Sequence, residues 1–247
     1  MRSLEKLAWV EGKLFTRDPL TVVFTLVFPA LVVVILGAAF ADEPPDATVW
    51  RGVEAIDFYV PAYIGLALSA MGLISVSVHV AAYREQGVLR RFRAAGIPAP
   101  TIMGAEVLVS ALVTIPGIVG LIAIGVLGYD ARLPAAPWGV LLAFALSAVA
   151  FASLGVLIGA LMPGTRAAQG LGLILFFVMM FLAGAGPPRE ILPAWMRYVG
   201  DVLPLTHVVT TLFEPWVGFG VSIAELAGVA AMAALAASLG GLALRRI

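Results

Sequence analysis

The sequence contains no cysteine among its 247 residues, and it has few charged side chains. Without cysteine the chain can form no disulfide, no thiolate nucleophile and no cysteine-ligated metal site. Only 12% of its residues are charged, whereas a soluble domain carries roughly 25%. Hydrophobic residues make up 62% of the chain, in runs long enough for membrane-crossing helices. The composition therefore predicts an all-α integral membrane protein.

Catalytic and nucleotide-binding motifs are also absent. The sequence contains no Gly-x-Ser-x-Gly, no His-Glu-x-x-His and no Gly-x-x-x-x-Gly-Lys-Ser/Thr. Its two histidines, His79 and His207, are expected on opposite sides of the membrane, so they cannot share a metal ion. We expect no catalytic site, cofactor, metal or nucleic acid on this chain. If ATP drives it, ATP and magnesium bind to another polypeptide.

Six apolar segments of helical length follow one another within a single transmembrane domain, 1–247. They are 20–40, 58–82, 101–128, 138–162, 167–186 and 219–244. The first makes a helix of about 31 Å, which is enough to cross the hydrocarbon core. Because the number of spans is even, both chain ends should lie on the same side.

Residues 1–18 show the pattern of an amphipathic helix lying at the membrane surface. Apolar side chains share one broad arc, and Lys13 and Arg17 belong to a basic cluster on another. Glu11 falls inside the apolar arc. It is either an unpaired surface carboxylate or the buried partner of an arginine elsewhere, for which Arg84 and Arg91 are the candidates.

The loop 83–100 is the most basic short segment of the chain. Its charged residues are Arg84, Arg90, Arg91 and Arg93, opposed by Glu85. Gly87 permits a sharp exit from the second span, and Pro98 and Pro100 stop the helix that follows.

Val88, Leu89 and Phe92 recur in this loop at helical spacing, which predicts a short amphipathic helix. Two interpretations fit it. The loop is a basic anchor that only orients the spans, or its helix docks a cytosolic partner, with the apolar residues as the tip and arginines around them.

Residues 187–218 are too polar and too rich in proline to cross the membrane. The pattern predicts a partly re-entrant helical hairpin before the last span, with Trp195 and Trp216 at the level of the lipid head groups.

Basic residues are unevenly divided between the two sides of the predicted membrane. Eleven lie on the side of the chain ends: Arg2, Lys6, Lys13, Arg17, Arg84, Arg90, Arg91, Arg93, Arg166, Arg245 and Arg246. Four lie opposite: Arg51, Arg132, Arg189 and Arg197. This asymmetry predicts cytosolic termini. Two lysines against thirteen arginines, with abundant alanine and glycine, fit a GC-rich bacterial genome, so we expect the inner membrane of a bacterium.

Two motifs resemble those of a known family. Arg84-Glu85-Gln86-Gly87-Val88-Leu89 is similar to a Glu-Arg-Glu-x-Gly-Thr-Leu-Glu stretch, from which Tyr83, Val88 and Arg90 depart. Leu192-Pro193-Ala194-Trp195, followed by Leu203-Pro204-Leu205-Thr206, is similar to a Leu-Pro-x-Trp and x-Pro-Leu-Thr pair. With six spans and the N-terminal helix, the chain resembles the permease subunit of a type 2 ABC transporter, in the group of bacterial drug and antibiotic-resistance exporters.

The resemblance implies two permeases, identical or paralogous, served by two copies of a cytosolic ATPase. It implies that the loop after the second span couples ATP hydrolysis to export of a small amphiphilic compound: a drug, an antibiotic or a lipid-like molecule. It also implies a path between protomers, lined mainly by the second and fifth spans. The candidate path residues are Tyr63, Met71, Ser75, Phe176, Phe177, Met179, Met180 and Phe181, which otherwise pack helices or face lipid.

Two other functions stay open. An ion-coupled secondary carrier generally needs ionisable residues within the membrane, and Glu106 and Glu225 are expected only near its edges. A non-transporting scaffold or immunity protein is the second alternative. Dependence of transport on an ATPase partner separates both from a permease.

Overall fold

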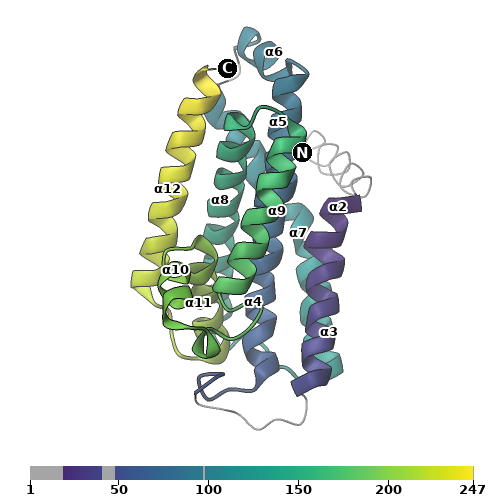
Figure 1. The fold of residues 1–247 in the computed structure, drawn as a ribbon, viewed down its shortest axis with the longest axis vertical. Coiled ribbons are helices and arrows are strands. Elements are labelled where there is room, and N and C mark those ends of the chain that lie inside the picture. Colours follow the sequence, from purple (N-terminus) through teal and green to yellow (C-terminus); the bar gives the residue numbers. More distant parts are fainter. Residues whose placement is uncertain (1–18, 41–47, 97, 247) are drawn as a thin grey trace.

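The computed structural model describes residues 19–40, 48–96 and 98–246, all of whose regular structure is helical (Figure 1). The expected N-terminal helix, with Glu11, Lys13 and Arg17, lies outside the described residues. Within them, six helices are long and apolar enough to cross a membrane. The predicted all-α membrane fold with six spans is thus confirmed.

The first two spans each contain a π-helical segment, in which the helical turns are widened. The first comprises α2 (Pro19–Val22), the π-helix η1 (Val23–Val27) and α3 (Phe28–Phe40). The second comprises α4 (Ala55–Ala70), the π-helix η2 (Met71–Val76) and α5 (Ser77–Glu85). π-helical segments are rare in proteins, and those that do occur are often found at functional sites.

The other four spans are unbroken helices. They are α7 (Ala99–Tyr129), α8 (Pro137–Leu161), α9 (Thr165–Leu182) and α12 (Ile223–Arg246). The fifth span ends before the expected residue 186, and the sixth begins after the expected residue 219. More of the chain therefore belongs to the segment between them.

The second span is the centre of the bundle. It is 89% buried along its most apolar stretch, whereas the first, third and sixth spans are about one-fifth buried. It contacts α3, α7, α8, α9 and α11. A span that is apolar all round and surrounded by other helices is the core of the protein.

The two ends of the bundle differ in structure. The short helix α6 (Val88–Ala94) and the last turn of α12 lie at one end, here called the α6 end (Figure 1). The opposite hairpin end carries η3 (Arg189–Ile191), α10 (Ala194–Gly200) and α11 (Pro204–Val217).

Helix α11 is too short to cross a membrane, since its 14 residues extend about 21 Å. It is nevertheless buried along most of its length, against α4, α8, α9 and α12. Trp195 on α10 is 62% exposed, as expected for a head-group residue. Trp216 is only 1% exposed, and its Nε1 donates to the main-chain oxygen of Arg132 at 3.0 Å. Trp216 is therefore covered by the bundle, because α11 packs into it, and its expected depth at the head groups stays a prediction.

Candidate functional site

The loop after the second span turns sharply at Gly87. This residue has φ +68°, in the left-handed region that glycine adopts without steric cost, and it precedes the first residue of α6. The glycine of the Arg84–Leu89 motif is therefore explained by the turn that it forms. The turn directs α6 away from the axis of α5.

Arg84 and Glu85 hold the turn between α8 and α9. Arg84 Nη1 donates to the main-chain oxygen of Ala160, in the last turn of α8, at 2.7 Å. Glu85 Oε1 accepts from the main-chain N–H of Thr165, the first residue of α9, at 3.1 Å. Both bonds satisfy main-chain groups left without partners at helix ends, and each places a favourable charge there. The motif thus clamps the end of the second span to the fourth and fifth.

Leu89 does not form an exposed apolar tip. It is 6% exposed and packs in a cluster with Val76, Val80, Met103 and Leu244, which come from η2, α5, α7 and α12. Phe92 is half-buried, with its ring 6.5 Å from that of Tyr83. The expected position of Leu89 at an apolar tip is therefore wrong, since the bundle itself covers this side chain.

Arg93 links α6 to the end of the sixth span. Its Nη2 donates to the main-chain oxygens of Leu244 at 2.9 Å and of Arg245 at 2.6 Å. Arg90 and Arg91 are exposed, and Val88 is half-buried. The surface that α6 offers to a partner is therefore basic. The helix itself is bonded to α12, and the end of α5 before it is bonded to α8 and α9.

The π-helix η2 lies in close contact with two neighbouring helices. A Cβ added to Gly155 of α8 would overlap the main-chain oxygen of Gly72, and one added to Gly172 of α9 would overlap that of Leu73. Glycine permits these approaches because it has no side chain. The widened turns of the central span are thus packed directly against the backbones of the fourth and fifth spans.

Most candidate path residues are buried within the single chain. Tyr63, Met71, Ser75, Phe176, Met179 and Met180 are at most 7% exposed. Met71 and Ser75 belong to η2 itself. Phe177 and Phe181 instead lie on the exposed side of α9. The six buried candidates do not line one seam. Met71 and Ser75 face α7 beside Glu106 and Ser110, and Phe176 packs against Phe24 and Phe28 of the first span.

A small polar cavity lies beside η2. Its lining includes Ser75, His79, Glu106 and Ser110, and its volume of about 10 Å³ has room for about one water molecule. The Ser75 hydroxyl is buried without a hydrogen-bond partner in the described residues. The sequence gives no sign of this grouping, because His79 and Glu106 belong to different spans.

The motif residues of the hairpin shape its turns. Pro193 directly precedes α10, and Pro204 is the first residue of α11, where a missing N–H costs nothing. The Thr206 hydroxyl donates to the main-chain oxygen of Gly200 at 2.6 Å, which closes the connection between the two helices.

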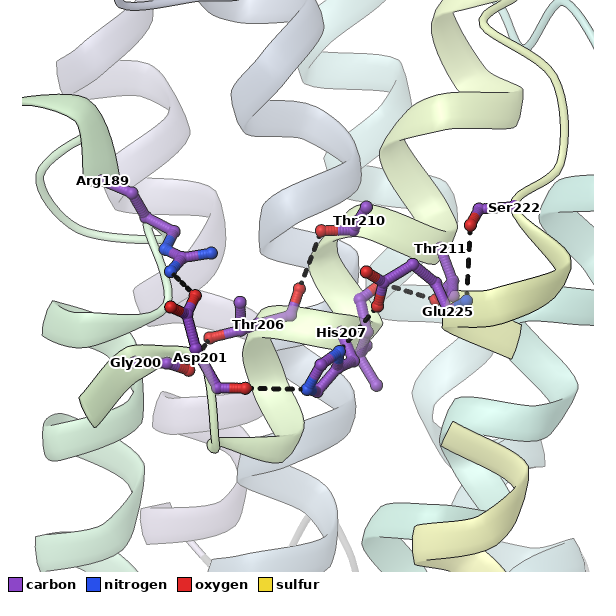
Figure 2. A network of polar contacts seen from close by, with 10 residues as sticks. Arg189, Gly200, Asp201, Thr206, His207, Thr210, Thr211, Ser222 and Glu225 are labelled. Carbon is purple, nitrogen blue, oxygen red and sulfur yellow. Dashed lines mark hydrogen bonds and ion pairs between the residues drawn. The ribbon is translucent and has the colours of Figure 1, made fainter. Parts of the chain in front are cut away.

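A chain of polar contacts joins this hairpin to the sixth span (Figure 2). Arg189 pairs with Asp201. His207 lies with Nε2 3.0 Å from the main-chain oxygen of Asp201 and Nδ1 2.6 Å from Glu225 Oε2. Glu225 lies in the first turn of α12, so these contacts link the fifth-to-sixth connection to the start of the last span.

Ion pairs gather at the hairpin end. Besides those already described, Arg51 pairs with Glu214 and Arg132 with Asp57, both at 3.3 Å. At the α6 end, Arg90, Arg91, Arg166 and Arg245 form no ion pair with any residue that the structure describes. The two ends therefore differ in free positive charge as well as in shape. Across the described residues, no group of three or more potential metal ligands occurs.

Comparison with known proteins gives two findings. The sequence model of the family described as ABC-2 type transporter matches residues 3–214, which include α6, the central span and both motifs. A Bacillus subtilis (strain 168) protein named "Putative transport permease YvfS" is 24% identical over 217 residues, covering 87% of this chain and 85% of that protein.

Proposed function

Because the chain belongs to the ABC-2 type transporter family, as a membrane-spanning permease subunit, we propose that it forms the path of an ATP-driven exporter of small amphiphilic compounds. A separate ATPase subunit supplies the energy, since the sequence has no phosphate-binding loop. The substrate class is a drug, an antibiotic or a lipid-like molecule.

The observation that carries this proposal is that α6 and the end of α5 directly before it are bonded to three other spans. Movement of a partner bound to Arg90 and Arg91 would pass through Arg84 to α8, through Glu85 to α9 and through Arg93 to α12. A loop that served only as a basic anchor has no need of such bonds. Residues 84–92 are therefore our candidates for the coupling element.

The charge distribution supports an orientation with the α6 end in the cytosol of a bacterium. Arginines without acidic partners retain their full effect on membrane orientation, and in the described residues Arg90, Arg91, Arg166 and Arg245 gather at that end. At the hairpin end, Arg51, Arg132 and Arg189 are each paired with an acid.

The exposed side of α9 supports pairing of two permeases, identical or paralogous, above two ATPase subunits. Ile174, Phe177, Val178 and Phe181 are exposed there in a nearly continuous apolar stripe. In a membrane, such a stripe faces lipid or another helix, and helix packing is what drives association between spans.

Transport then requires the buried contacts of the central span with its neighbours to open. Met71 lies on the side of η2 that faces α7, and Met179 and Met180 are buried on α9. Methionine side chains repack readily around varied apolar ligands. The π-helical turn is a natural place for this change, because its backbone bonding is already irregular.

The test is transport by the chain reconstituted in proteoliposomes with and without an ABC-type ATPase that co-purifies with it. We expect uptake of a fluorescent amphiphile into inside-out vesicles only with both subunits and magnesium-ATP. The purified chain alone should hydrolyse no ATP. The control is the same pair carrying a disabled ATPase lysine.

Two outcomes would overturn the proposal. Transport by the chain alone that collapses with an uncoupler would indicate an ion-coupled carrier. Purification without any ATPase, together with no flux of any compound in a panel of amphiphiles, would indicate a scaffold or immunity protein.

A further inference from the structure

A groove runs along the surface of the bundle in the half of the membrane nearest the α6 end. It has a volume of about 600 Å³ and lies between α7, α8 and α12. Its lining is mostly apolar and comprises Met103, Gly104, Val107, Val149, Ser153, Ala237, Ser238, Gly241, Leu242 and Arg245.

The dimensions of this groove match one leaflet of a bilayer. On α12 it extends from Ala237 to Arg245, a rise of about 12 Å, against about 15 Å for half of a hydrocarbon core. Gly104 and Leu242 are exposed, so the groove opens toward the surroundings of the bundle. Within a membrane those surroundings are acyl chains or another helix.

Small residues make the groove concave. A Cβ added to Gly104 would meet no atom within 4 Å, and one added to Gly241 would make only an ordinary contact with Met103. Ser153, which is 2% exposed, adds a polar side chain to the wall.

The end of the groove at the membrane surface is positively charged. Arg245 lines it, and Arg93 is held beside it by its bonds to the main-chain oxygens of Leu244 and Arg245. Neither arginine forms an ion pair with a described residue. Two guanidinium groups above an apolar groove are complementary to a phosphate above an acyl chain.

We propose that this groove binds one phospholipid with a net negative head group, its acyl chain between α7, α8 and α12 and its phosphate at Arg245 and Arg93. A zwitterionic lipid has the same chain and phosphate, but its ammonium group weakens the attraction to an unpaired basic site. The binding does not depend on the proposed transport function. Only the identity of the leaflet, the cytosolic one, rests on the proposed orientation.

The bound lipid would touch the parts that hold α6 in place. Met103 lines the groove and also belongs to the cluster around Leu89, and Leu244 of that cluster precedes Arg245. Occupancy of the groove should therefore stabilise the attachment of α6 to α12.

The test is native mass spectrometry of the full purified chain, exchanged into detergent that contains equal amounts of phosphatidylglycerol and phosphatidylcholine. We expect the chain to retain one phosphatidylglycerol in preference to phosphatidylcholine. Arg245→Gln should lower this retention about fivefold, the effect of one basic residue near a membrane surface. Gly104→Leu should abolish it by filling the groove.

Gly120→Leu is the matched control for the filled groove, since Gly120 also lies exposed on α7 with no atom within 4 Å of its Cβ. It should retain the lipid as the unchanged chain does. Gly241→Leu is a second obstruction in case Gly104→Leu does not fold. Equal retention of the two lipids would overturn the proposal, as would unchanged retention in the folded groove-filling variants.

Discussion

At the scale of single residues, the α6 end is held together by side chains bonded to main-chain groups. Arg84 and Arg93 donate to carbonyl oxygens in the last turns of α8 and α12, and Glu85 accepts from the first N–H of α9. Such bonds do not need an opposite charge, so they leave the surface of this end positively charged. The α6 end thus keeps its positive charge although three of its charged side chains are used in bonds.

Arg84→Ala should destabilise the fold by about 1–2 kcal/mol, because a charged hydrogen bond to a half-buried carbonyl is lost. The measurement is the midpoint of thermal unfolding in detergent. Arg166→Ala is the control at the same end, since Arg166 is exposed. A midpoint equal to that of the control would show that the bond to Ala160 contributes nothing.

The pair of His207 and Glu225 should contribute less to the free energy of unfolding than the bond of Arg84 does, because both side chains are about 30% exposed. A double-mutant cycle with His207→Ala and Glu225→Gln should give a coupling of about 0.5–1 kcal/mol at low salt, weakened in high salt. Additive effects on thermal unfolding would mean that the contact does not hold α11 to α12.

At the scale of elements, the π-helix of the central span determines how closely the neighbouring helices pack. Gly155 and Gly172 are the contact points, because any side chain there would meet a carbonyl oxygen of η2. Glycine costs a helix about 0.5–1 kcal/mol relative to alanine. At these two positions, close packing offsets that cost.

Gly172→Ala should therefore destabilise the protein by about 1–3 kcal/mol through overlap with the backbone of Leu73. Gly170→Ala, on the same helix, should be neutral or slightly stabilising, since its Cβ would meet no atom within 4 Å. Thermal unfolding of the two variants compares them directly. Equal effects would contradict the close contact between η2 and α9.

The sequence predicts the spans well and their surroundings poorly. Length and hydropathy locate six helices, because the membrane imposes both. The burial of Leu89 and Trp216 cannot be predicted in this way. A hydrophobic face must be covered, but its spacing does not say whether a partner, lipid or another helix of the same chain covers it. The pairs Arg51–Glu214 and Arg132–Asp57 join residues far apart in sequence, which no local pattern relates.

At the scale of the whole molecule, the two ends have separate chemistry. The hairpin end pairs three of its arginines, Arg51, Arg132 and Arg189, with acids. The α6 end leaves Arg90 and Arg91 free of acidic partners in the described residues. This difference favours a cytosolic α6 end and an acidic partner surface there.

Single cysteines test the orientation cleanly, because the chain has no cysteine of its own. Tyr198→Cys, at an exposed position on α10, should react with an impermeant reagent in intact cells. Ala94→Cys, exposed on α6, should react only after the cells are opened. The opposite pattern of labelling would reverse the proposed orientation.

The central claim is that the basic face of α6 receives the force of ATP hydrolysis, and charge reversal tests it most directly. The measurement is ATPase co-purification and ATP-dependent transport for the double variant Arg90→Glu with Arg91→Glu, beside Arg197→Glu at the hairpin end. Both arginines are exposed, so the variant should insert and unfold like the unchanged chain. We expect it to lose the ATPase and transport, whereas Arg197→Glu keeps both. If the double variant still binds the ATPase and transports at the unchanged rate, α6 is only a topological anchor.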